Sequence, residues 1–216
     1  MDKLIIGGGL LGTELHKQTR WDLMRSWTVP GELWNMTRYK VIINCMAHTD
    51  TSDNTKETHW EANYVLVKAM IDFCNQEKIK LIHISTDYIY SGSKSNATEE
   101  DVPVHNNSWY SYTKLVADAL VQLESNDYLI CRGTHKPFPF PYPSAWIDQS
   151  GNFDYVHVIA DLIIRLINEG ANGVYNVGTN LKTMYELKGF GEPIWKPENT
   201  PGDITMNTDK LKKLLK

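Results

Sequence analysis

The sequence predicts an α/β fold, a Rossmann-like doubly wound parallel sheet followed by a smaller C-terminal lobe. A glycine-rich turn follows an apolar run at the very start of the chain, and further apolar runs are continuous rather than alternating. Continuous runs are typical of strands buried on both faces of a parallel sheet, and helical patterns separate them here. With 216 residues, 42% of them hydrophobic, the chain can bury one substantial core.

The first elements are a strand in "KLIIGG" and a helix in "LLGTELHKQ", where Leu11 and Leu15 are spaced for one helix face. Apolar runs at 40–47 and 79–85 predict two more buried strands, and residues 59–77 between them predict a helix. The segment "YSYTKLVADALVQLE" predicts the next helix, and "DYLICR" the strand after it. Strand and helix thus alternate, as in a doubly wound sheet.

After Arg132, four prolines alternate with aromatic residues in residues 133–152, which predicts a loop without regular elements. Such a loop can be a docking ligand for another domain, but we expect it to line or cover a site. Structure resumes with a helix in "VIADLIIRLINEG" and a strand in "GVYNVG". A capping box, Thr183 to Glu186, and a last helix in "TDKLKKLLK" complete the chain.

Composition narrows the range of partners and locations. The net charge is −4 without runs of one sign, so we expect neither nucleic acid nor a membrane surface as a partner. Cys45, Cys74 and Cys131 are odd in number and far apart, which favours free thiols in a reducing compartment and a cytoplasmic location. The first residues have no signal-peptide layout, and no apolar run is long enough to span a bilayer.

The glycine-rich turn places Gly7, Gly9 and Gly12 at the spacing G-x-G-x-x-G, with Leu10 and Leu11 opening the helix. After a strand and before a helix, this spacing is the fingerprint of a dinucleotide site, in which helix N–H groups face a pyrophosphate. A glycine-rich turn of an ordinary α/β protein is the alternative.

The choice between NADPH and NADH depends on the end of the second strand. An NAD site usually has an acidic residue there, but Asp22 comes too early in "RWDLMRSW", and Arg25 falls where the strand should end. An arginine suits a 2′-phosphate, so we expect NADPH to be preferred over NADH. Alternatively, Arg25 is a solvated loop residue.

A Tyr followed four positions later by a Lys occurs in "YVLVK" (64–68), "YSGSK" (90–94) and "YSYTK" (110–114). The second contains Ser-Gly-Ser, which favours a loop and gives no common face. The first and third both put the pair on one helix face. We choose Tyr110 and Lys114, because the strand before them ends in Ser85 and Thr86, whereas the strand before Tyr64 offers no hydroxyl.

These segments resemble the extended short-chain dehydrogenase/reductases, and among them the dTDP-4-dehydrorhamnose reductase family. The segment "ISTDYIYSG" is similar to that family's Ser-Thr-Asp-Tyr-Val-Phe, and "INCMAHTDTSD" to its Asn-Ala-Ala-Ala-x-Thr. Asn63 falls where the family has an Asn that opens a helix, and the tail "NTPGDITMNTDKL" is similar to the family's ending. The chain departs from the family at Ile6, where a glycine is usual, and in shorter stretches at 20–40 and after 132.

The resemblance implies roles for individual residues. Tyr110 would give a proton to the developing alkoxide, with its pKa lowered by Lys114, and Thr86 would hydrogen-bond the carbonyl. It assigns further residues to the nicotinamide cofactor (Met46, Ala47, His48, Asn63, Tyr110, Lys114) and to the sugar (Thr86, Asp87, His135), with no metal ion. His135, which replaces a family aromatic, could equally be structural.

The resemblance predicts a dinucleotide-binding core over residues 1–132 and a smaller substrate-binding part over 133–216, with 157–178 packing back on the core. It implies a reductase of a nucleotide-linked 4-keto-6-deoxy sugar, and a homodimer is the assembly we consider. A nucleotide-sugar epimerase or dehydratase is the alternative, although dehydratases carry Asp-Glu where this chain has Asp87 and Tyr88. A non-catalytic regulatory subunit that binds the cofactor is another.

Overall fold

A six-stranded parallel sheet forms the centre of the protein in the computed structural model, which describes residues 2–27, 36–101, 108–198 and 200–216. The strand order is β10-β5-β4-β3-β1-β2, and every neighbouring pair is parallel. The strands are β1 (Lys3–Ile6), β2 (Asp22–Met24), β3 (Val41–Asn44), β4 (Lys80–Ile84), β5 (Tyr128–Arg132) and β10 (Gly173–Asn176). The predicted doubly wound sheet is confirmed.

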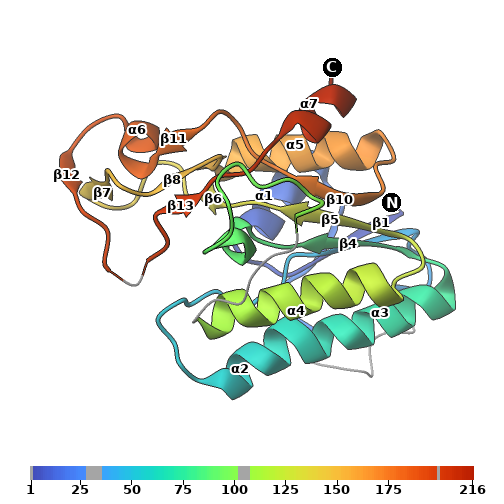
Figure 1. Ribbon diagram of the computed structural model, residues 1–216. Helices are drawn as coiled ribbons and strands as arrows, with labels where there is room; N and C mark the ends of the chain where they lie inside the picture. Colours follow the sequence, from blue (N-terminus) through green and yellow to red (C-terminus); the bar gives the residue numbers. More distant parts are fainter. Residues whose placement is uncertain (1, 28–35, 102–107, 199) are drawn as a thin grey trace.

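Helices cover both faces of the sheet (Figure 1). On one face lie α1 (Leu10–Thr19) and α5 (Val156–Asn168), which pack on each other and on the sheet through one hydrophobic cluster that includes Leu15 and Ile163. On the other face lie α2 (Lys56–Trp60), α3 (Leu66–Glu77) and α4 (Trp109–Glu124), whose cluster includes Met70 and Val121. Each layer buries the apolar stripe that its helices present.

The order of the strands locates the cleft. From β1 the chain moves outward to β2, and it returns to β3 on the other side of β1. This reversal is a topological switch point, where open α/β sheets bind ligands beyond the carboxyl ends of their strands. Gly7 and Cys45 follow β1 and β3 at these ends.

The helix predicted over 59–77 differs in where it begins and in its type of helical turn. It begins earlier, at Lys56, and a π-helical segment, η2 (Glu61–Val65), separates α2 from α3. Such segments add a residue to the helical ladder and occur frequently at functional sites. Asn63 lies within this segment and is buried.

The prediction that no regular element forms in 133–152 is wrong. This stretch contains β6 (His135–Lys136), β7 (Ser144–Trp146) and β8 (Ser150–Gly151). Each pairs with a segment distant in sequence: β6 with β9 (Asp154–Tyr155), β7 with β12 (Glu192–Ile194), and β8 with β11 (Lys182–Thr183) and β13 (Asp203–Ile204). Strands this short form only because remote partners supply their hydrogen bonds, so local composition could not indicate them.

The remaining C-terminal helices agree with the prediction. The helix α6 (Met184–Lys188) begins with the expected capping box, in which Thr183 and Glu186 exchange hydrogen bonds, and α7 (Asp209–Leu214) ends the chain. The short strands and α6 lie together at one end of the molecule, beyond the carboxyl ends of the central strands (Figure 1). They cover the end of the sheet at which the cleft opens.

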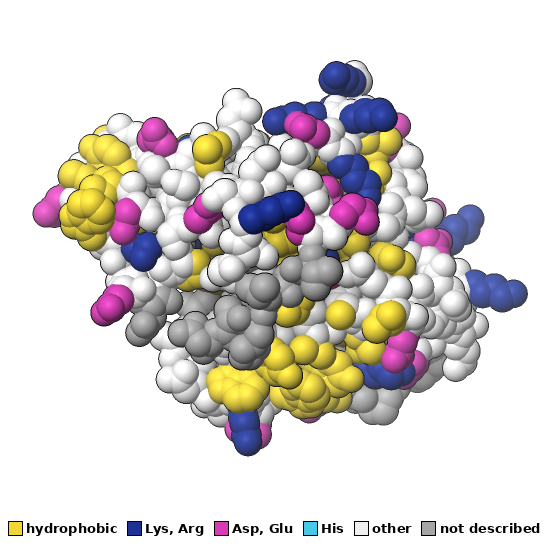
Figure 2. Space-filling view, in the orientation of Figure 1, with side chains coloured by type: hydrophobic (Ala, Val, Ile, Leu, Met, Phe, Trp, Pro, Cys, Tyr) yellow, Lys and Arg dark blue, Asp and Glu magenta, His cyan; other side chains and the backbone are white. Residues whose placement is uncertain are grey.

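The cysteines and surface charges also agree with expectation. Cys45, Cys74 and Cys131 are free thiols. On the face shown in Figure 2, Lys and Arg side chains are interspersed with Asp and Glu. None of the helices in the described ranges is both long and apolar enough to cross a membrane.

Candidate active site

The glycine turn closes tightly against the neighbouring strands. Gly7 has φ 113°, which only glycine adopts readily, and a Cβ there would lie 2.8 Å from the backbone of Cys45. A Cβ on Gly12 would collide with the carbonyl oxygen of Gly7. Gly9 is different, because nothing described lies within 4 Å of a Cβ placed on it. Gly9 therefore faces open space at the N-terminus of α1.

A cavity of about 570 Å³ begins at this turn and runs along the carboxyl ends of the strands. Its lining includes nine residues that the sequence assigned to the site: Gly9, Leu10, Leu11, Met46, Ala47, Thr86, Tyr110, Lys114 and His135. The glycine turn and the Tyr-Lys helix, a hundred residues apart in sequence, thus share one cavity.

Thr86, Tyr110 and Lys114 come together as the sequence predicts. Thr86 follows β4 and caps a short 3₁₀ turn by accepting a hydrogen bond from the backbone N–H of Tyr88 at 3.2 Å. Tyr110, from the first turn of α4, lines the same cavity as Thr86, close enough for the Thr86 side chain to influence its pKa. One turn further along α4, Lys114 is 2% exposed and donates to the carbonyl of Ile84 at 2.6 Å. The two hydroxyls can therefore approach the same ligand atom.

The expectation that Lys114 lowers the pKa of Tyr110 is not met. Burial raises the pKa of Tyr110 to about 12, and the neighbouring Asp87 and Tyr88 act in the same direction, against the opposing influence of the Thr86 side chain. Burial also lowers the pKa of Lys114 to about 8. Desolvation is the largest cause of both shifts, and neither group is among the causes that shift the pKa of the other. Tyr110 consequently keeps its proton at neutral pH, as a proton donor requires.

Asp87 lies behind the cavity wall and is fully buried. Its Oδ1 accepts a hydrogen bond from Thr134 at 2.6 Å, whereas its Oδ2 has no hydrogen-bond partner among the described residues. Burial raises the pKa of Asp87 to about 6. In β6, beyond Thr134, burial lowers the pKa of His135 to about 4, so its imidazole is neutral near pH 7, and Lys136 beside it also lines the cavity.

Asn63 and His48 do not line the cavity. Asn63 is 1% exposed; its Oδ1 accepts from the backbone N–H of His48 at 2.8 Å, and its Nδ2 donates to the carbonyl of His48 at 3.0 Å and to Thr113 at 3.1 Å. Asn63 therefore links the segment after β3 to α4 through these hydrogen bonds. Asn63 is placed to support residues that line the cavity, including Ala47 and Thr49.

Arg25 occupies the position expected for the adenosine end of a dinucleotide. It follows β2 directly, is exposed, and its carbonyl accepts a hydrogen bond from the N–H of Gly8 at 2.8 Å. Asp22 lies at the opposite end of β2, where its carboxylate accepts a hydrogen bond from Tyr39 at 2.8 Å. The exposed positive charge of Arg25 thus lies next to the glycine turn, at the switch point of the sheet.

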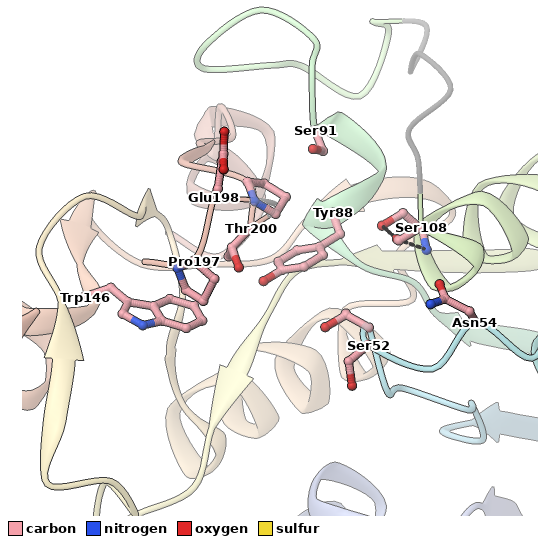
Figure 3. Close-up of a pocket in the computed structure, with 12 residues that line it drawn as sticks. Ser52, Asn54, Tyr88, Ser91, Ser108, Trp146, Pro197, Glu198 and Thr200 are labelled. Atoms are coloured by element: carbon pink, nitrogen blue, oxygen red, sulfur yellow. Dashed lines mark hydrogen bonds between the residues drawn. The ribbon is translucent and has the colours of Figure 1, made fainter. Parts of the chain in front are cut away.

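A second cavity, of about 790 Å³, adjoins the first and shares Thr51, Tyr88 and Trp146 with it. Figure 3 shows the ring of Tyr88 near the middle of this cavity, between Ser52 on one side and Pro197 and Trp146 on the other. Its ring also contacts that of Tyr110, with centroids 6.1 Å apart. The sequence interpretation missed Tyr88, Trp146 and Lys136 as lining residues, although two of them directly follow residues that it chose.

The other tyrosines with a Lys four positions on lie elsewhere. Tyr64 packs against Trp60, with ring centroids 4.3 Å apart. Tyr90 is 2% exposed; its hydroxyl donates to Asn176 at 2.9 Å and accepts from Arg132 at 2.6 Å. Neither residue lines the cavity that contains the glycine turn.

The parallel sheet, the glycine turn and the Thr-Tyr-Lys group together define an extended short-chain dehydrogenase/reductase, a class of nicotinamide-dependent oxidoreductases. A family model described as the RmlD substrate binding domain matches residues 4–135, more than half of the chain. The chain therefore belongs to this family.

Individual relatives agree with the family. A dTDP-4-dehydrorhamnose reductase of Mycobacterium tuberculosis is 24% identical over 213 residues, covering 80% of this chain and 68% of its own. Among solved structures, a dTDP-4-dehydrorhamnose reductase of Bacillus anthracis in complex with NADP superposes with a TM-score of 0.82 at 19% identity, over 99% of this chain and 92% of that one. A hypothetical dTDP-4-dehydrorhamnose reductase of Sulfolobus tokodaii also has a TM-score of 0.82, at 20% identity over 99% and 94%. Both structures confirm the fold.

Proposed function

We propose that the protein is an NADPH-preferring reductase of a nucleotide-linked 4-keto-6-deoxy sugar, in which Tyr110 supplies the proton. The observation that carries this proposal is the single cavity that joins Gly9, Thr86, Tyr110 and Lys114. The Mycobacterium tuberculosis relative, named a dTDP-4-dehydrorhamnose reductase, supports the choice of substrate class.

The residues present fit a nicotinamide dinucleotide. Gly9 leaves open space where a pyrophosphate would approach the N-terminus of α1, and the exposed Arg25 stands at the end of β2. The guanidinium can donate paired hydrogen bonds to a 2′-phosphate, which favours NADPH. When bound, the cofactor supplies a hydride to the substrate carbonyl.

The protein then has to position and protonate the carbonyl oxygen. Thr86 and Tyr110, which line the same cavity, can both donate to that oxygen and polarise it. As negative charge develops, Tyr110 gives up its proton, and Lys114 one helical turn away stabilises the resulting phenolate. Trp146 and Tyr88, at the junction of the two cavities, are placed to hold the rest of the substrate.

The neutral His135 lines the first cavity, and the buried Asp87 lies behind its wall. We assign both to orientation of the sugar. Asp87 acts through Thr134, to which it is hydrogen-bonded and which itself lines the cavity.

A turnover assay tests the proposal. The purified protein is mixed with NADPH or NADH and a dTDP-4-keto-6-deoxy sugar, and the absorbance of the reduced cofactor is followed. We expect oxidation of cofactor in proportion to the sugar supplied, faster with NADPH at low concentration. No oxidation with several such sugars would exclude the reductase, and a tightly bound cofactor that turns over without net consumption would indicate an epimerase.

A further inference from the structure

His48, Asp53 and His59 form a cluster on the far side of the loop that lines the first cavity. Each offers one ligand atom, and the three atoms lie within 4.8 Å of one another. Imidazole and carboxylate groups brought this close are the usual donors for divalent transition metals. None of the three side chains is needed for the chemistry of Tyr110.

The ring of His59 has one nitrogen without a partner. Its Nε2 lies 3.1 Å from the backbone carbonyl oxygen of Asp53, and because a carbonyl only accepts, Nε2 carries the hydrogen. Nδ1 is then left with a free lone pair. It is buried, in a residue that is 0% exposed, and has no hydrogen-bond partner among the described residues. Buried polar atoms are normally satisfied, so an orphaned acceptor here needs an explanation.

The other two members complete a set of donors. His48 Nε2 lies 2.7 Å from Asp53 Oδ2, and the rings of His48 and His59 meet edge to face with centroids 4.5 Å apart. The side chains of His48 and Asp53 are 28% and 26% exposed, so water and ions can reach the cluster from one side. The second oxygen of Asp53 accepts from the N–H of Thr55 at 2.8 Å, which fixes the carboxylate.

We propose that His48 Nε2, Asp53 Oδ2 and His59 Nδ1 bind a divalent transition-metal ion of the zinc class, with water as the fourth ligand. The hydrogen bond from His59 Nε2 to a backbone carbonyl is the support that metal-bound histidines usually have. The metal replaces the hydrogen bond between His48 and Asp53, so any proton they share is released to solvent. Mg²⁺ and Ca²⁺, which prefer oxygen ligands, do not suit this set.

A bound ion would link the loop after β3 to α2. His48 and Asp53 belong to that loop. His59 lies on α2, the helix that ends directly before the π-helical segment. Ala47, Thr49 and Thr51 of the same loop line the cavity. The ion would therefore hold the cavity wall from behind, in addition to the hydrogen bonds of Asn63.

Titration with Co²⁺ tests the site directly. After dialysis against a chelator, the full chain is titrated with Co²⁺ while the visible absorption is recorded. We expect bands that saturate at one Co²⁺ per chain, lack thiolate charge transfer, disappear on adding Zn²⁺ and do not change with Mg²⁺. His59→Gln keeps a donor near Nε2 but removes Nδ1, so affinity should fall by at least the roughly 10- to 100-fold that loss of a supporting partner costs.

The matched control is His16→Gln, because the His16 ring also contacts a backbone carbonyl, that of Trp21 at 2.7 Å, but lies outside the cluster. Its affinity for Co²⁺ should equal that of the parent. Asp53→Asn, at a partly exposed position, should weaken binding as His59→Gln does, and it decides the matter if His59→Gln fails to fold. The proposed site would be refuted if Co²⁺ binding did not saturate at one ion per chain. It would also be refuted if the parent and both cluster variants bound Co²⁺ with equal affinity.

Discussion

Tyr110 is the residue on which the proposed chemistry depends. Removing its hydroxyl in Tyr110→Phe keeps the ring contact with Tyr88 but takes away the proton donor. Turnover should fall by roughly 10²- to 10⁴-fold, the usual contribution of a positioned general acid, with cofactor affinity nearly unchanged. Steady-state rates and a cofactor titration measure the two effects. Tyr64→Phe is the control and should stay within a few-fold of the parent, since Tyr64 packs on Trp60; the reverse result would refute the assignment.

Asp87 should make stability depend on pH in an unusual direction. Burial raises its pKa from 3.8 to about 6, so the folded protein binds this proton more tightly than the unfolded chain does. Between about pH 4 and pH 6 the contribution of Asp87 to the free energy of unfolding therefore falls as pH rises. Asp87→Asn removes this contribution, and its stability relative to the parent should rise by up to about 3 kcal/mol from pH 4 to pH 7.

Urea unfolding at several pH values measures this difference, and parallel pH profiles for parent and variant would contradict a buried, proton-binding Asp87.

At the scale of single residues, the sequence predicted which residues meet but not their ionisation. Thr86, Tyr110 and Lys114 follow from strand ends and helix spacing. The high pKa of Tyr110 depends on burial by segments remote in sequence, which spacing does not reveal.

The turn between β1 and α1 offers a test at the scale of elements. Gly9 has ordinary backbone angles, φ −71° and ψ −168°, and room for a Cβ. Gly9→Ala should thus leave the melting temperature unchanged yet weaken cofactor binding at least tenfold, because the methyl group occupies the space proposed for the pyrophosphate. Gly12→Ala should instead destabilise the protein itself, since its Cβ collides with the carbonyl of Gly7.

Thermal melts and cofactor titrations of both variants separate the two effects. If Gly9→Ala bound cofactor as the parent does, the cavity beside Gly9 would not be the cofactor site. The elements of the core were predictable because each carries its own local pattern, a continuous apolar run in β3 and β4 and a helical period in α5. The strands β6, β7 and β8 were not, because two or three residues carry no period and their partners lie far along the chain.

At the scale of the whole molecule, Tyr90 belongs to a buried network that joins β5, β10 and α4. Its hydroxyl donates to Asn176 in β10 and accepts from Arg132 in β5, and Arg132 also pairs with Asp118 in α4 at 2.7 Å. Tyr90→Phe leaves buried partners unsatisfied and should lower the free energy of unfolding by about 1–3 kcal/mol. Tyr128→Phe is the control. Its change in the free energy of unfolding should be near zero, because the Tyr128 hydroxyl has no hydrogen-bond partner among the described residues. Urea unfolding compares them; equal stability of the two variants would show that the network contributes little.

The central claim is that a hydride passes from the nicotinamide to a sugar carbonyl in the cavity between Gly9 and Tyr110. The most direct measurement supplies NADPH deuterated at either face of nicotinamide C4, together with a dTDP-4-keto-6-deoxy sugar, and examines the product by mass spectrometry. We predict that one of the two labelled cofactors, and not the other, places a single deuterium on C4 of the sugar, and that Tyr110→Phe forms this product far more slowly. A reduced sugar without deuterium from either cofactor, or labelled product formed by Tyr110→Phe at the parent rate, would contradict the account.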